Sequence, residues 1–139
     1  MADLFNAKCQ LPVKEAEDKE LLSGGTIYFA PPDYHVLLEA DKSLALSSDE
    51  PVLFSRPSID VLFESAADAY GAQLIAVVLT GANHDGARGA RAVMDSGGVV
   101  LIQEPETAFA SAMPEAAIRL CPSARVLSLT AMAGFIGEA

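Results

Sequence analysis

Residues 74–98, LIAVVLTGANHDGARGARAVMDSGG, decide the fold that we expect for this chain. Residues 74–79 form an unbroken apolar run rich in Val and Ile, which is typical of a strand buried on both faces of a parallel sheet. Polar residues 80–86 follow, and apolar residues then recur at helical spacing until Gly97 and Gly98 end the segment. The stretch therefore predicts a strand, a tight loop and a helix.

The loop of this unit carries the candidate site. In open α/β sheets, ligands and chemistry lie beyond the carboxyl ends of the strands, where this chain places Asn83, His84 and Asp85. Asp85 also has a structural interpretation, because a carboxylate at a helix start commonly accepts that helix's first N–H groups. His84 is a poor partner for Asp85, since sequence neighbours at a helix start point in different directions. A metal site on this pair is not favoured, because the chain has only two histidines and no second group of ligands at metal-binding spacing.

Composition excludes several classes of protein. The 139 residues predict a single domain, 1–139. A net charge of −10 and a pI near 4.4, with scattered basic residues, argue against nucleic-acid binding. No apolar run approaches the ~20 residues of a membrane helix and residues 1–10 do not resemble a signal peptide, so we expect a cytoplasmic protein without membrane insertion. Cys9 and Cys121 lack companion ligands, which predicts reduced, mostly buried thiols, and no motif predicts a cofactor.

The N-terminal half predicts mainly short strands. A short helix is expected at 3–10 and a strand at 11–16, followed by a charged, solvated turn at 17–19. Strands at 26–30, 35–39 and 44–47, joined by tight turns, predict an antiparallel meander. His35 starts one of them, and we expect its ring to bond nearby backbone.

The second half alternates helices with strands. Ser58 is expected to cap a helix ending near Tyr70, with an apolar stripe on one face and Asp60, Glu64 and Asp68 facing water. Strands at 99–103 and 125–129 flank a loop at 104–107 and a helix at 114–120, with Met113 extended before that helix. Thr130 is predicted to cap a final helix, whose inward-facing residues are Met132, Phe135 and Ile136. This order predicts an α/β fold with a doubly wound, mostly parallel sheet and right-handed crossovers, plus the antiparallel meander.

Four segments in order carry a family resemblance: GTIYFAPPDYH (25–35), FSRPSIDVLFESAA (54–67), VVLTGANHDGARG (77–89) and GGVVLIQEPETAFASAMPEAAI (97–118). Together they resemble the catalytic domain of the chemotaxis protein-glutamate methylesterase CheB, over nearly the whole chain. The resemblance implies a Rossmann-like, doubly wound α/β fold with an antiparallel hairpin. It also implies hydrolysis of γ-glutamyl methyl esters on the cytoplasmic helices of chemoreceptors, deamidation of receptor glutamines, and a Ser-His-Asp triad.

The resemblance assigns roles to individual residues. Asp85 matches the triad aspartate, which orients the histidine and stabilises its imidazolium. Ala82 matches a position whose backbone N–H lies at the oxyanion hole. The residues expected around the pocket are Thr80, Gly81, Asn83, His84, Gly86, Met113, Pro114 and Ser58.

The chain departs from the family in one large respect. The family's nucleophilic serine lies in a Gly-Ala-Ser-Thr-Gly-Gly loop and its histidine in a Gln-His-Met segment, and neither appears in this sequence. The chain therefore corresponds to the C-terminal two-thirds of the domain, and we expect it to be inactive alone. If turnover were seen, Ser58 and Ser55 would be the first substitute nucleophiles to test.

Three hypotheses remain open at this point. The natural product is longer and carries the missing residues; the chain is a non-catalytic module that binds the receptor; or the amides of 81–86 bind a small molecule or phosphate. The family's first two βα units supply strands in the middle of its sheet, and this chain lacks them. We therefore also expect either a homodimer that covers the missing region or a rearranged sheet in which the Leu11 strand pairs with the Leu74 strand.

Overall fold

A three-stranded parallel sheet organises the C-terminal part of the computed structural model, which describes residues 11–52, 56–81 and 84–137. Its strands are β5 (Ile75–Val78), β6 (Val99–Gln103) and β7 (Arg125–Leu127), in the order β5-β6-β7. Both pairings are parallel, with Ile75 opposite Val99 and Leu101 opposite Arg125. The predicted parallel sheet is confirmed, and Leu101 and Ile102 of the middle strand are fully buried.

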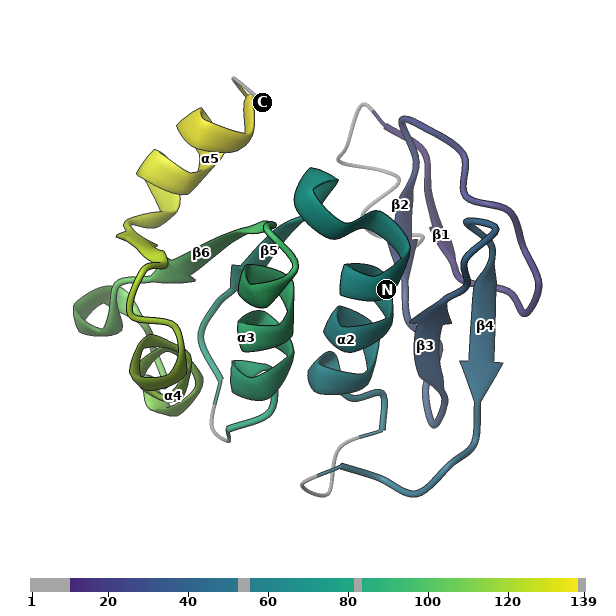
Figure 1. Cartoon of the computed structure of the whole chain (residues 1–139), viewed down its shortest axis with the longest axis horizontal. Helices are drawn as coiled ribbons and strands as arrows, with labels where there is room; N and C mark the ends of the chain where they lie inside the picture. The colour runs from purple at the N-terminus through teal and green to yellow at the C-terminus, as the bar shows by residue number, and fades with distance from the viewer. Residues whose placement is uncertain (1–10, 53–55, 82–83, 138–139) are drawn as a thin grey trace.

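Three helices lie in a row, of which α3 and α4 contact β5 and β6: α2 (Ile59–Tyr70), α3 (Ala87–Asp95) and α4 (Ala112–Leu120) (Figure 1). A short 3-10 turn, η1 (Gly71–Gln73), joins α2 to β5. The last helix, α5 (Leu129–Gly137), lies apart from the row and contacts β6 and β7. The helix predicted from Ser58 to Tyr70 is confirmed, including its cap, because the Ser58 hydroxyl accepts the Val61 N–H.

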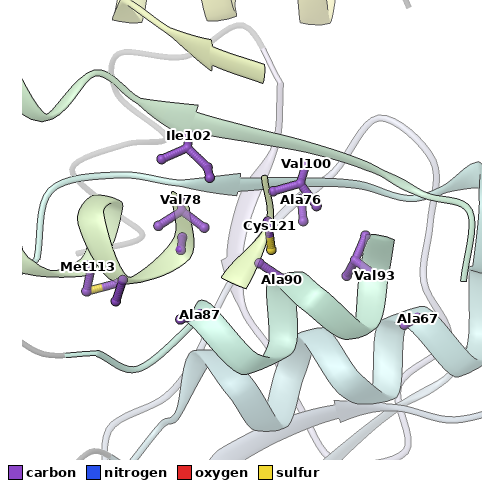
Figure 2. Packing of buried hydrophobic residues seen from close by; sticks show 12 residues of the cluster. Ala67, Ala76, Val78, Ala87, Ala90, Val93, Val100, Ile102, Met113 and Cys121 are labelled. Carbon is purple, nitrogen blue, oxygen red and sulfur yellow. The ribbon is translucent and has the colours of Figure 1, made fainter. Parts of the chain in front are cut away.

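Small side chains fill the space between the sheet and the helices. Figure 2 shows Ala76, Val78, Val100 and Ile102 of the strands near Ala87, Ala90 and Val93 of α3, with Met113 and Cys121 of the α4 segment beside them. At Gly89, where α3 crosses α2, an added Cβ would lie 2.6 Å from the Phe63 Cβ and 3.0 Å from the Asp60 Cα. The two helices approach this closely because the crossing position has no side chain.

The N-terminal β region differs from the predicted meander. β1 (Val13–Glu15) pairs in parallel with β2 (Ile27–Phe29), and only β3 (His35–Leu38) and β4 (Leu44–Ser47) form an antiparallel hairpin. The meander was wrong because Pro31 and Pro32 follow β2 and cannot donate ladder hydrogen bonds. The pairing of the Leu11 strand with the Leu74 strand was also wrong, since β1 uses β2 instead.

Helix α2 also covers the hairpin. A second hydrophobic cluster contains Ala16, Val36 and Leu44, and Leu62 of α2 packs against it. The same helix contributes Ala67 to the main core. α2 therefore lies between the hairpin and the parallel sheet and packs against the hydrophobic cluster of each.

Three elements differ in their bounds or caps from the prediction. α4 starts at Ala112, so Met113 lies in the helix and is not in the extended conformation that was predicted. Its N–H donates to the Gly81 carbonyl. Residues 105–107 form a 3-10 turn, η2 (Pro105–Thr107). Ser128 rather than Thr130 caps α5, because its hydroxyl accepts the Ala131 N–H. Met132 is buried as expected, but Ile136 is 48% exposed. The helix predicted at 3–10 lies outside the described residues.

The described residues contain no helix that is both long and apolar enough to span a membrane. Cys121 is buried and unpaired, as expected, and burial raises the pKa of its thiol. Cys9 lies outside the described ranges.

Candidate active site

Asp85 lies in the loop between β5 and α3, and its carboxylate points toward the start of α2. It is 3% exposed. Its Oδ1 accepts the Ser58 hydroxyl at 2.8 Å and the Asp60 N–H at 3.0 Å, and its Oδ2 accepts the Ile59 N–H at 2.6 Å. The expected capping role is thus real but falls on the neighbouring helix: Asp85 binds the first N–H groups of α2 instead of α3.

Asp60, in the first turn of α2, in turn caps α3. Its Oδ1 accepts the Gly86 N–H at 3.0 Å and the Gly89 N–H at 2.7 Å, both at the start of α3. The prediction that Asp60 faces water was wrong, since it is 4% exposed, whereas Glu64 and Asp68 are exposed as expected. A helical-periodicity argument misses this because the N-termini of two helices lie side by side here and both need acceptors.

Burial raises the pKa of the Asp60 carboxyl, and the nearby charge of Asp85 acts in the same direction. The N–H groups of Gly89 and Gly86 and the charge of Arg88 partly offset this rise. The carboxyl groups of Asp60 and Asp85 thus lie close together at the N-termini of α2 and α3, where the helix dipoles favour negative charge.

Gly86 connects the loop to α3 with a φ of 106°, a conformation that residues with a Cβ rarely adopt. Its N–H is held by Asp60, and the Gly81 N–H donates to the Ala110 carbonyl at 2.9 Å. The amides at both ends of the 81–86 loop are therefore engaged. This weakens the hypothesis of a phosphate site built on them.

The start of the loop is fixed by residues that follow β6. The Thr80 N–H donates to the Gln103 Oε1 at 3.0 Å, and the Thr80 hydroxyl lies 2.7 Å from the Ala110 nitrogen and 3.0 Å from its oxygen. The Met113 N–H donates to the Gly81 carbonyl at 3.1 Å. Gln103 was missed by sequence reasoning; the signal was a polar residue closing the apolar run VVLIQ at the carboxyl end of a strand.

His35 is fully engaged with backbone and stands 1% exposed. Its Nδ1 accepts the Ser58 N–H at 3.0 Å, so the proton sits on Nε2, which donates to the Glu50 carbonyl at 2.9 Å. The prediction that His35 bonds backbone is confirmed, although its partners are distant in sequence. With both nitrogens used, His35 has no ring nitrogen left for proton transfer.

Most predicted pocket residues converge into two adjoining groups. Ser58, Asp85 and Gly86 meet at the helix starts, and Thr80, Gly81 and Met113 meet where the loop joins the α4 segment. An added Cβ on Gly86 would touch both Ile59 and Met113, so the groups are neighbours. Pro114 is buried in the first turn of α4. Ala82, Asn83 and Ser55 lie outside the described residues.

His84 points elsewhere: it is exposed and lines a cavity of about 390 Å³ with Asp60, Arg88, Ala116, Arg119 and Leu120. It is the only one of the predicted pocket residues in that cavity's wall among the described positions. Ser58 instead borders a smaller apolar cavity of about 130 Å³ beside Pro57 and Leu62. Within the described ranges, no three His, Cys, Asp or Glu side chains are grouped so that they could hold a metal ion.

A family assignment follows from comparison with known proteins. The family model described as CheB methylesterase matches residues 1–136. The chain belongs to the CheB methylesterase family. This confirms the resemblance drawn from the four sequence motifs.

Two curated relatives show how similar the chain is to other members of the family and how much of their length it covers. A Leptospira interrogans protein, provisionally named a protein-glutamate methylesterase/protein-glutamine glutaminase, is 49% identical over 125 residues, which are 90% of this chain and 65% of that protein. Protein-glutamate methylesterase/protein-glutamine glutaminase 1 of Rhodospirillum rubrum is 40% identical over 91% of this chain and 33% of its own length. The chain thus spans less than two-thirds of these curated relatives.

The fold is shared with the crystal structure of the Thermotoga maritima CheB methylesterase catalytic domain. The TM-score is 0.93 at 34% identity, over 99% of this chain and 74% of the other. The α/β fold with a parallel sheet is therefore that of the CheB catalytic domain.

Proposed function

We propose that the chain forms the aspartate-bearing part of a protein-glutamate methylesterase, which acts in the cytoplasm on γ-glutamyl methyl esters of chemoreceptor helices and deamidates their glutamines. The observation that supports this is the placement of Asp85. It is a buried carboxylate just beyond the carboxyl end of a parallel strand, and three donors from α2 fix its orientation. A rigid carboxylate in that place suits the task of orienting an imidazole and stabilising its charged form.

The residues around Asp85 indicate that the isolated chain has no esterase activity. Ser58 bonds to Asp85 directly and is 2% exposed, so no histidine stands between them. His35 uses both ring nitrogens on backbone groups. An ester hydrolase of this type needs a serine activated by a histidine. We propose that a segment outside these 139 residues, with the Ser and His motifs of the family, completes the site.

A fusion protein tests this proposal. The quarter of the Thermotoga maritima catalytic domain that this chain does not cover is joined ahead of it, and methanol release from methylated chemoreceptor is measured. We expect turnover from the fusion and none above buffer from the 139-residue chain. Asp85→Asn in the fusion should lower kcat by roughly 10³-fold or more, because the amide favours the wrong imidazole tautomer.

Asp41→Asn is the matched control, since Asp41 also accepts a backbone N–H and a serine hydroxyl, but lies in the turn between β3 and β4. It should leave most of the fusion's activity intact. Equal loss in both variants would show a structural effect and contradict the assigned role of Asp85. Turnover by the isolated chain would contradict the need for a preceding segment.

A further inference from the structure

Two arginines share the cavity of about 390 Å³ that lies where the starts of α2 and α3 approach α4. Arg88 is in the first turn of α3 and Arg119 in the last turn of α4. Ala116 and Leu120 contribute apolar wall, and His84 and Asp60 contribute polar groups. Its volume falls in the range of ordinary small-ligand sites. We call it the arginine cavity.

The cations of this cavity form no ion pair within the part of the chain that the structure describes, although the charge of Arg88 acts on the Asp60 carboxyl. No ion pair or side-chain hydrogen bond there involves the Arg88 or Arg119 guanidinium. Arg91, on the same helix as Arg88, contrasts with them: it binds Asp95 at 3.0 Å and the Leu120 carbonyl at 2.9 Å. In a chain of net charge −10, two arginines beside one carboxylate in a single concavity are a local excess of positive charge.

Asp60, the acid in the wall, offsets only part of their charge. The Asp60 Oδ1 already accepts the Gly86 and Gly89 N–H groups, and a single carboxylate faces two guanidinium groups. His84 can donate or accept a hydrogen bond at the rim. The balance of the cavity is therefore cationic, with apolar surface beside the cations.

We propose that the arginine cavity binds the carboxylate of a glutamate on the substrate protein, close to the ester under attack. Guanidinium groups bind carboxylates through paired hydrogen bonds, and the apolar wall suits the two methylenes of a glutamate side chain. The cavity adjoins the proposed catalytic loop, because His84 directly precedes Asp85 and the Asp60 N–H binds the Asp85 carboxylate. The inference rests on the proposed function, whose product is itself a glutamate carboxylate on a helix.

Binding to the ¹⁵N-labelled 139-residue chain tests this by NMR titration. The probe is an alanine-based helical peptide with glutamates four residues apart, and its control has glutamines at the same positions. We expect saturable shifts confined to the amides of Ala87, Arg88, Ala116 and Arg119 with the glutamate peptide. The glutamine peptide should bind roughly tenfold more weakly.

Variants locate the interaction. Arg88→Gln and Arg119→Gln should each weaken binding of the glutamate peptide by roughly five- to tenfold, and Arg88→Lys by less. Arg125→Gln, which removes the same charge from β7, is the control and should have no effect. Both cavity arginines are exposed, and an unchanged ¹⁵N spectrum of the free variant verifies its fold.

Three outcomes would overturn the proposal: shifts elsewhere on the surface, equal binding of the two peptides, or equal competition by inorganic phosphate, which would indicate a general anion site. The titration requires no turnover. Failure here therefore leaves the esterase proposal standing, and failure of the fusion leaves this binding result standing.

Discussion

Asp60 and Asp85 cap each other's helices. Asp85, which precedes α3, accepts N–H groups of Ile59 and Asp60 in α2, while Asp60, inside α2, accepts those of Gly86 and Gly89 at α3. The two carboxylates thus tie two helix starts together at the edge of the candidate site. Their environments also differ, because Asp85 receives a hydroxyl in addition to amides.

Removing the Asp85 carboxylate should destabilise the fold strongly. Asp85→Ala leaves the Ser58 hydroxyl, the buried Asp60 N–H and the partly buried Ile59 N–H without this acceptor, so we expect a loss of about 3 kcal/mol or more in the free energy of unfolding. Asp85→Asn retains one acceptor oxygen and should cost about half as much. Urea unfolding followed by circular dichroism measures both. A loss below about 1 kcal/mol for the alanine variant would show that water replaces these bonds.

Asp60→Asn should be neutral or stabilising at pH 7, by up to about 1 kcal/mol, because it removes a buried charge next to Asp85. A single oxygen of Asp60 accepts both bonds, so an amide oxygen can keep them.

The sign of its pH dependence follows from the raised pKa of Asp60. The stabilising contribution of protonated Asp60 is fully present below the ordinary value of 3.8 and is lost as pH rises through the higher folded value. The variant's advantage over wild type should therefore grow from pH 3 toward neutrality. Unfolding curves at several pH values decide this, and an advantage that shrinks with rising pH would contradict it.

Two glycine-to-alanine substitutions should have opposite signs. Gly89→Ala places a Cβ against the Phe63 Cβ and the backbone of Asp60, so α2 and α3 must separate, at a cost of about 2 kcal/mol. Gly134→Ala in α5 meets nothing within 4 Å and should stabilise by up to ~1 kcal/mol through helix propensity. Thermal unfolding of both proteins gives the comparison. Equal effects would mean that the crossing of α2 and α3 is looser than the structure shows.

His35 should be needed for stability through both ring nitrogens. His35→Ala removes the acceptor for the Ser58 N–H and the donor to the Glu50 carbonyl, and leaves a cavity, for a loss of about 3 kcal/mol. His35→Asn places an oxygen near the Nδ1 position and should recover part of the loss. Hydrogen exchange at the Ser58 amide checks the mechanism, since it should accelerate in the alanine variant more than in the asparagine variant.

The elements of the fold were predictable from local patterns. The apolar runs of β5 and β6 and the stripe of α2, with Ser58 as its cap, follow from periodicity and capping rules that act within one segment. The predicted meander was wrong because the pairing partner of a strand is set by tertiary structure. β2, which Pro31 and Pro32 follow, pairs with β1 and not with β3.

The candidate site was only partly predictable, for the same reason. Asp85 was found, but its bonds reach back 25 to 27 residues to α2, and no local rule identifies that helix as its partner. Asp60 was placed in water because charges at helical spacing usually are. A signal was available: an acid in the first turn of a helix complements positive helix ends, including a neighbour's.

The position of α2 between the hairpin cluster and the main core has a consequence for how the chain loses structure. Leu62 belongs to one apolar cluster and Ala67 to the other, five residues along a single rigid element. Neither cluster can be exposed by detaching α2 without exposing the other as well. The hairpin and the parallel sheet should consequently melt as one cooperative unit, with coincident transitions at either end of the molecule, and a protease that cuts within α2 should release both at once.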